Sequence, residues 1–390
     1  MPLTGRGGSN PLPTLSYQRE GRRRLPRVAD PDPGFPDGPD PGCTRSEDLG
    51  DSWTEWKGAA LTMKRLVAFV SVGTLTLLGL VALSGPTQAK IPGPNGQIAF
   101  GRDDGHIFII NPDGTNEHEL TLAYPAFNPV WSPDGSKLLL NVFAPNLPVR
   151  PVTVDADGSD LNLLTVPQAP SDMDLACRAW SPDGRRLLCQ GQIFEGDHSL
   201  DGVYTIRASD GGDLTRLTVN PFPPTGEFGG GDIPGDYSPN GEQFVFMRAK
   251  PGADPNARHQ RGALFVENTD GTELHLVAPY GLANSHDNGV PRWSPDGTEI
   301  LFAGAKGSLF VVHPDGTGVR AIPYTGGGYS YAVSPGWSPD GTSIVFNLFL
   351  DTTGQLDLYT ARSDGSDVTK VADAPNFEDN ADWGPHPLST

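Results

Sequence analysis

Acidic and aromatic side chains gather in the segments that precede a recurring WSPDG motif. These segments read PQAPSDMDLACRA, NPFPPTGEFGGGDIPGD, YGLANSHDNGVPR, YTGGGYSYAVSPG and APNFEDNAD. Their candidate binding residues are Asp172, Asp174, Glu227, Asp232, Asp236, His286, Asp287, Tyr329, Tyr331, Glu378, Asp379 and Asp382. If the fold brings them together, they form an acidic funnel suited to a basic peptide, a sugar or a divalent cation. The alternative for each single residue is a solvated loop position.

Sequence patterns of catalysis are sparse. The chain has no Gly-x-Ser-x-Gly nucleophile motif, and its eight histidines show no His-x-x-x-His spacing. We therefore predict no cofactor and no metal site, and we favour binding over catalysis. The alternative is a carbohydrate-active lyase or hydrolase in the same funnel, with His286 or an aspartate as the base.

Two cysteines flank one copy of the motif. Cys177 and Cys189 lie on either side of Ser181 to Gly184, about equally far from the centre of that turn. If the turn closes a hairpin, the two side chains can face each other and form a disulfide in an oxidising compartment. The alternative is two buried, reduced thiols.

The elements that position these residues are repeats. WSPDG-type motifs begin at Trp131, Trp180, Tyr237, Trp293 and Trp337, and a degenerate copy begins at Trp383. The spacings are 49, 57, 56, 44 and 46 residues, close to the ~40–50 residues of one propeller blade. A second set of turns has Asp-Gly at Asp113, Asp157, Asp210, Asp270, Asp315 and Asp364. Six copies of each motif predict six units.

Each unit contains four strands. Proline presets the first turn, Asp and Gly tolerate the dihedral angles that reverse the chain, and apolar runs such as KLLLNVF and SIVFNLF follow. The second turn favours a two-residue or bulged hairpin. We expect an all-β, six-bladed propeller of four-stranded antiparallel blades, with the motif tryptophans packed between blades.

The two ends of the repeat region complement each other. Trp383-Gly-Pro has no strand after it, whereas the residues from Pro94 to Phe100 resemble the second half of a repeat. We predict that the strand Gln97 to Arg102 completes the last blade and closes the ring, which removes exposed sheet edges.

These WSPDG and Asp-Gly repeats resemble the WD40-like (PD40-type) repeats of the TolB propeller family. The resemblance covers Asn95 to Pro385. The protein that gives the family its name is periplasmic, binds a peptidoglycan-associated lipoprotein through its propeller, and carries an α/β domain before the propeller. The segment from Ala89 to Asn95 is too short for such a domain, so the resemblance implies the propeller and not the complete role.

The first 89 residues differ from the rest. Residues 1–62 are rich in Arg, Pro and Gly without periodicity, and we interpret them as a disordered leader, upstream of a true start at Met63. Residues 63–89 have a basic start, an uncharged run from Leu66 to Leu83 and small residues at their end, which is typical of a signal peptide. We expect the mature propeller to comprise residues 90–390. An uncleaved signal-anchor that tethers it to a membrane is the alternative.

Charge narrows the class of partner. Because ten of the 28 Lys and Arg and nine of the 47 Asp and Glu precede Lys90, residues 90–390 carry a net charge of −20. Such a surface repels nucleic acid and anionic lipid. The sequence predicts a periplasmic or secreted monomer that binds a protein or cell-envelope component, with no nucleic acid and no stable membrane insertion after cleavage.

Overall fold

In the computed structural model, the WSPDG motif closes a hairpin between two antiparallel strands. In the first copy, the Ser132 amide donates to the Lys137 carbonyl at 2.8 Å, and the Gly135 amide donates back to the Ser132 carbonyl at 2.9 Å. The Ser132 hydroxyl donates to the Asp134 carboxylate at 2.7 Å. Gly135 has φ 71°, in the left-handed region that favours glycine. The motif therefore specifies a turn, and the apolar runs on either side become paired strands.

The Asp-Gly turns form the bulged type of hairpin. In the first copy, the Asn111 amide donates to the Thr115 carbonyl and the Gly114 amide donates to the Asn111 carbonyl, both at 2.9 Å. Gly114 has φ 80°. The Thr115 amide and hydroxyl both donate to Asp113, at 3.0 and 2.6 Å. Asn116 also has a positive φ, 56°. This second left-handed residue after the glycine aligns the outer strand with its neighbour.

The structure describes residues 93–102, 104–193, 198–221, 231–250, 262–284, 290–304, 307–324, 330–350, 353–372 and 377–386. These residues form six four-stranded antiparallel sheets. Three of the sheets, from inner to outer strand, are β24 (Glu378–Pro385), β1 (Asn95–Arg102), β2 (Ile107–Ile110) and β3 (His118–Leu120); β4 (Ala126–Trp131), β5 (Lys137–Val142), β6 (Arg150–Asp155) and β7 (Asn162–Leu163); and β8 (Asp174–Trp180), β9 (Arg186–Gln192), β10 (Gly202–Arg207) and β11 (Thr215–Arg216).

The other three sheets repeat this order. They consist of β12 (Gly231–Tyr237), β13 (Gln243–Ala249), β14 (Gly262–Asn268) and β15 (His275–Ala283); β16 (Arg292–Trp293), β17 (Ile300–Ala303), β18 (Leu309–Val312) and β19 (Arg320–Ile322); and β20 (Ser330–Trp337), β21 (Ser343–Leu350), β22 (Gln355–Arg362) and β23 (Thr369–Lys370). A short 3₁₀ helix, η1 (His198–Leu200), lies between β9 and β10. We name each sheet, or blade, by its inner strand.

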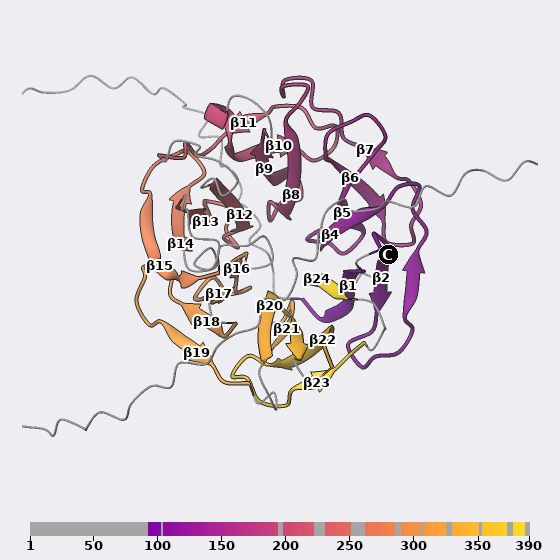
Figure 1. The fold of residues 1–390 in the computed structure, drawn as a ribbon, viewed down its shortest axis with the longest axis vertical. Coiled ribbons are helices and arrows are strands. Elements are labelled where there is room, and N and C mark those ends of the chain that lie inside the picture. Colours follow the sequence, from indigo (N-terminus) through magenta and orange to yellow (C-terminus); the bar gives the residue numbers. More distant parts are fainter. Residues whose placement is uncertain are drawn as a thin grey trace, which may run out of the picture. The chain divides into compact units, whose positions relative to one another are not determined.

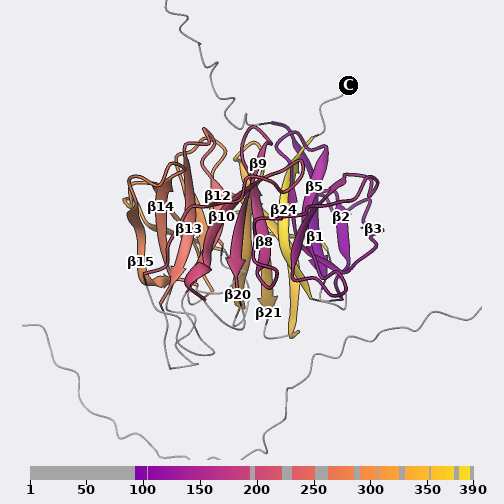
Figure 2. The same cartoon turned by 90° about the horizontal axis from the view of Figure 1, so that it is seen from above.

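The six blades stand around a common centre in sequence order, which confirms the predicted propeller (Figure 1). Seen edge on, the strands run between the two faces of the ring (Figure 2). We call the face on which the inner strands begin the entrance face; Ala126, Asp174, Gly231, Ser330 and Glu378 mark it. The opposite face carries the WSPDG and Asp-Gly turns, and we call it the turn face.

The ring closes as predicted, by pairing of the first and last strands. β1 lies between β24 and β2, with Ile98 opposite Trp383 and Arg102 opposite Glu378. The pairing begins at Asn95, two residues earlier than the predicted Gln97. The first strand thus supplies what the last repeat lacks.

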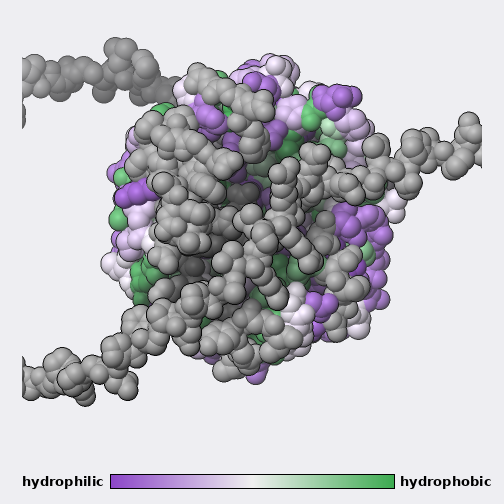
Figure 3. Space-filling model, in the orientation of Figure 1, coloured by the Kyte–Doolittle hydropathy of each residue, from purple (hydrophilic) through white to green (hydrophobic). Residues whose placement is uncertain are grey.

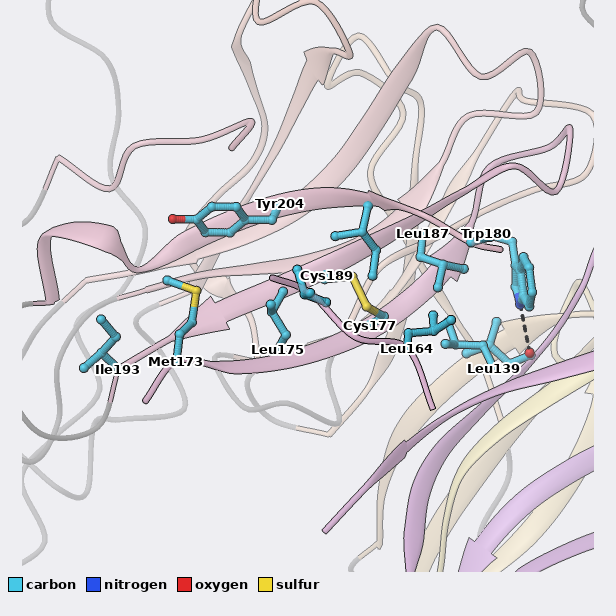
Figure 4. Packing of buried hydrophobic residues seen from close by; sticks show 14 residues of the cluster. Leu139, Leu164, Met173, Leu175, Cys177, Trp180, Leu187, Cys189, Ile193 and Tyr204 are labelled. Atoms are coloured by element: carbon cyan, nitrogen blue, oxygen red, sulfur yellow. Dashed lines mark hydrogen bonds between the residues drawn. A yellow bond between two sulfur atoms is a disulfide. The ribbon is translucent and has the colours of Figure 1, made fainter. Parts of the chain in front are cut away.

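Apolar side chains between the blades form the core. Trp180 packs in a cluster that includes Val130 and Leu139 of the preceding blade, and its indole Nε1 donates to the Val130 carbonyl at 3.2 Å (Figure 4). Cys177 and Cys189 lie opposite each other on β8 and β9 and form a disulfide in the same cluster. Each motif aromatic therefore has a structural role at a blade interface, as predicted for the tryptophans.

Among the described residues, no helix is long and apolar enough to cross a membrane.

Candidate functional site

The inner strands of the blades carry most of the predicted binding residues that can be placed. Asp174, Asp232 and Glu378 lie at the entrance-face ends of β8, β12 and β24. Asp236 and Asp382 lie deeper, each one residue before the motif aromatic. The sequence interpretation grouped all of these in one mouth, and the structure distributes them along the channel wall.

Asp232 is buried in an ion pair within its own blade. Arg248 lies directly opposite on β13 and donates to the two carboxylate oxygens from Nε at 2.6 Å and Nη2 at 2.7 Å. Its guanidinium also lies 5.2 Å from the ring centres of both Phe246 and Phe265. Burial disfavours the charged guanidinium, but the Asp232 carboxylate outweighs this effect, so the pKa of Arg248 is raised. Asp232 is therefore already neutralised.

Glu378 has an equivalent arrangement at the ring closure. Its side chain is fully buried, with the Arg102 Nη2 at 3.4 Å and the Leu358 amide donating to it at 2.8 Å. Arg102 also pairs with Glu117 at 2.8 Å and lies 3.8 Å from the Phe108 ring centre. Burial raises the pKa of Glu378 to about 7. Like Asp232, this carboxyl group faces protein rather than the channel opening.

Two further aspartates connect neighbouring blades. The Trp131 amide on β4 donates to Asp382 on β24 at 2.8 Å, and the Val149 amide before β6 donates to Asp174 on β8 at 2.8 Å. A carboxylate that accepts a backbone hydrogen bond across an interface stabilises that interface. These two residues therefore hold blades together.

The remaining predicted residues differ in exposure. Asp172 is exposed, and Tyr331 is 42% exposed and stacks on Phe349 with ring centres 4.8 Å apart. Asp236 and Asp379 are partly buried, and each has an interaction partner. Glu227, His286, Asp287 and Tyr329 lie outside the described residues. Asp172 and Tyr331 are thus the predicted residues that the structure places on the entrance face with an exposed side chain.

Sequence reasoning missed the residues that narrow the channel. A hollow of only about 10 Å³ is lined by Asn128, Arg178, Arg292, Ser334 and Asn380, among others. Arg292 donates from Nη1 to the Arg178 carbonyl at 2.9 Å, although another blade lies between theirs in the ring. Two arginines, Arg178 and Arg292, therefore meet at this hollow, in contrast to the acidic segments that the sequence suggested.

Three of the residues that line this hollow share one position in the sequence repeat, which could have identified them. Asn128, Ser334 and Asn380 each stand three residues before the motif tryptophan, and their φ angles are 53°, 51° and 50°. Asparagine tolerates this conformation better than most residues do. The strand pairing shifts at the same positions, so each is a β-bulge that faces the channel.

The described residues contain no group of three or more His, Cys, Asp or Glu side chains that could hold a metal ion.

Comparisons with known proteins support the fold. No family model matches the chain, and no curated protein sequence matches it. Among solved structures, TolB from Acinetobacter baumannii is similar at 16% identity and a TM-score of 0.54, over 78% of this chain and 69% of that one. Hydrazine synthase from Kuenenia stuttgartiensis is similar at 16% identity and a TM-score of 0.53, over 76% of this chain and 48% of that one.

A putative TolB from Agrobacterium tumefaciens is similar at 17% identity and a TM-score of 0.49, over 75% of this chain and 99% of that one. At 16% identity, the likeness to TolB from Acinetobacter baumannii and to hydrazine synthase establishes the fold alone. The chain is a six-bladed β-propeller whose structural neighbours include TolB-like propellers.

Proposed function

We propose that this protein is an exported, non-catalytic propeller that binds a protein or cell-envelope component on its entrance face. The observation that carries the proposal is the distribution of exposed apolar side chains. Nine large ones are exposed among the described residues. Six of them lie on the entrance face: Phe143, Leu147, Leu200, Val219, Tyr331 and Phe377.

These six residues form an arc across consecutive blades. Tyr331 is the second residue of β20 and Phe377 precedes β24. Phe143 follows β5 in the β4 blade, and Val219 lies shortly after β11 in the β8 blade. Val219 is 69% and Phe143 is 58% exposed. Exposed apolar side chains gathered on one face are typical of protein interaction sites. We call these six residues the apolar arc.

Charge bears on the kind of partner. In the space-filling view, hydrophilic and apolar areas alternate along the visible rim (Figure 3). The exposed Asp172 lies on the entrance face, and residues 90–390 carry a net charge of −20. An apolar arc with acidic neighbours favours a partner with an apolar centre and a basic rim.

The described carboxylates favour binding over catalysis. A glycoside hydrolase site typically needs two carboxyl groups free to act on the substrate. Asp232 and Glu378 instead face arginines, and Asp174 and Asp382 accept backbone amides. This geometry supports a binding surface more than the hydrolase form of the carbohydrate-active alternative.

The test is a pull-down from cell-envelope extract with the full-length protein, one triple variant and one double variant. We expect a defined protein to be captured by the unchanged protein and lost with Phe143→Ser/Tyr331→Ser/Phe377→Ser. The control is Leu274→Ser/Leu276→Ser, which removes two similarly exposed apolar residues, Leu274 just before the outer strand β15 and Leu276 within it. Capture that survives the triple variant, or no capture by the unchanged protein, would contradict the proposal.

A further inference from the structure

One blade interface departs from the repeat at two positions. Five motif aromatics are tryptophans, and the sixth is Tyr237; the motif aspartate is replaced in the same copy by Asn240. Both replacements lie on the turn face, where the β12 blade meets the β8 blade. The turn itself is kept, because the Ser238 hydroxyl and the Glu242 amide both donate to Asn240 Oδ1, at 2.7 and 3.1 Å.

The tyrosine is bonded differently from the tryptophans. The indoles of Trp180 and Trp337 reach the preceding inner strand and donate to the carbonyls of Val130 and Arg292, both at 3.2 Å. The hydroxyl of Tyr237 lies instead 3.0 Å from the Thr205 hydroxyl on β10. A phenol ring is smaller than an indole, so this interface contains less aromatic volume than an interface with tryptophan.

A cavity lies at this interface. Its volume is about 380 Å³, and both replaced residues line it. Its polar lining also includes hydroxyl groups of both blades and one cation: Arg186, Thr205, Thr215 and Thr269. Donors and acceptors that converge in a cavity of this size are typical of a small-molecule site.

Among the described residues, Arg186 forms no ion pair with a carboxylate, unlike the charged residues at the equivalent position of two other blades. At the same strand position in the β4 blade, Lys137 pairs with Asp155, and in the β16 blade Glu299 pairs with Arg320. Arg186 instead lies opposite Arg207 on β10.

In the part of the chain that the structure describes, the hydrogen-bond partners of Arg186 are neutral oxygens. Its Nε donates to the Thr205 hydroxyl at 3.0 Å and its Nη2 to the Asp213 carbonyl at 2.9 Å. Asp183 also lines the cavity, but its carboxylate accepts the Ser181 hydroxyl at 2.5 Å and has the Arg185 Nε at 3.9 Å. Within the described ranges, Nε and Nη2 of Arg186 donate to protein oxygens, so Nη1 can donate to an acceptor on a ligand.

We propose that this cavity binds a small hydroxylated carboxylate, of the size of a sugar acid. Arg186 would bind the carboxylate, because hydrogen bonds between a guanidinium and a carboxylate are charge-assisted and stronger than those between neutral groups. The threonine hydroxyls and Asn240 would bind the hydroxyls of the ligand. The site is on the turn face, so the inference stands or falls independently of the entrance-face proposal.

The first experiment compares three probes by calorimetric titration of the full-length protein. Glucuronate carries both a carboxylate and hydroxyls, glucose carries hydroxyls only, and acetate carries a carboxylate only. We expect glucuronate to bind at least ~10-fold more tightly than either of the others. Equal binding by glucose would overturn the role of Arg186, equal binding by acetate would overturn the role of the hydroxyls, and no binding of glucuronate at millimolar concentration would overturn the site.

The second experiment uses variants. Arg186→Gln should weaken glucuronate binding at least ~10-fold, Arg186→Lys should keep part of it, and the matched control Lys137→Gln in the β4 blade should leave it unchanged. Tyr237→Trp restores the repeat residue and fills the cavity, so it should abolish binding without lowering the Tm. Glucuronate binding unchanged by Tyr237→Trp would overturn the proposal even if the arginine variants fold poorly.

Discussion

Glu378 shows how burial acts on a single carboxyl group. Its surroundings are the Arg102 guanidinium, the Leu358 amide and the nearby Asp357 carboxylate, which is itself buried and lies 2.9 Å from Lys370. Burial dominates and raises the pKa of Glu378 from 4.5 to about 7. The folded protein therefore holds a proton there over a pH range in which the unfolded chain has lost it.

The sign of the resulting pH dependence follows directly. A raised carboxyl pKa contributes stability that is complete below pH 4.5 and is lost as the pH rises to about 7. We expect the free energy of unfolding to fall by up to about 3 kcal/mol over this range relative to Glu378→Gln, which cannot ionise. The measurement is urea unfolding of both proteins at several pH values. A difference between them that is constant with pH would contradict this expectation.

The turn aspartates act in a different pH range. Hydrogen bonds from Thr115 lower the pKa of Asp113 below its ordinary value of 3.8, and Asp270 and Asp364 have the same arrangement with Thr272 and Ser366. Their contribution to the free energy of unfolding is present above pH 3.8 and is lost as the pH falls further. Glu378 affects stability only above pH 4.5, so measurements of unfolding across the pH range separate the two effects.

At the scale of elements, the closing strand determines whether six blades make a ring. β1 pairs with β24 on one side and β2 on the other, so the two ends of the repeat region are held by one sheet. Gly96 lies at this seam, where an added Cβ would come within 2.5 Å of the Pro385 carbonyl oxygen. The contact atom is backbone, which cannot turn away as a flexible side chain can.

Gly96→Ala should therefore strain the seam and destabilise the protein by about 1–3 kcal/mol. Gly231→Ala is a matched control, because Gly231 begins the inner strand β12 and has no atom within 4 Å of its added Cβ. Thermal unfolding of both variants checks the prediction. Equal melting temperatures would mean that the closure tolerates a side chain at Gly96.

At the scale of the whole molecule, export remains a prediction from residues 63–89. We expect the protein isolated from its producing cells to begin at Lys90, because small residues at 87 and 89 follow the uncharged run. N-terminal sequencing measures this directly. An intact Met1 would contradict the internal start, and a chain that begins at Met63 would favour the signal-anchor.

The repeat pattern alone was enough to predict the architecture. Turn residues such as Pro133, Asp134 and Gly135 act through local dihedral angles and hydrogen bonds, so their recurrence marks every hairpin without reference to distant residues. The closure by β1 was also predictable, because the two incomplete repeats at the ends complement each other.

The candidate site was less predictable, because its chemistry depends on pairs that the fold brings together. When the repeats are aligned, Asp232 and Glu378 occupy the same position, five residues before the motif aromatic. The sequence does not distinguish a carboxylate exposed in a loop from one buried in an ion pair. For Glu378 the partner is Arg102, which is 276 residues away in the chain.

The sequence by itself thus determined the number of blades, their strand order and the closure of the ring, since these follow from local turn chemistry and period. Only the tertiary structure decided which carboxylates are buried against arginines, where the apolar arc lies and which interface holds a cavity. Those properties depend on burial and on contacts between blades, and a single sequence does not encode them as a local pattern.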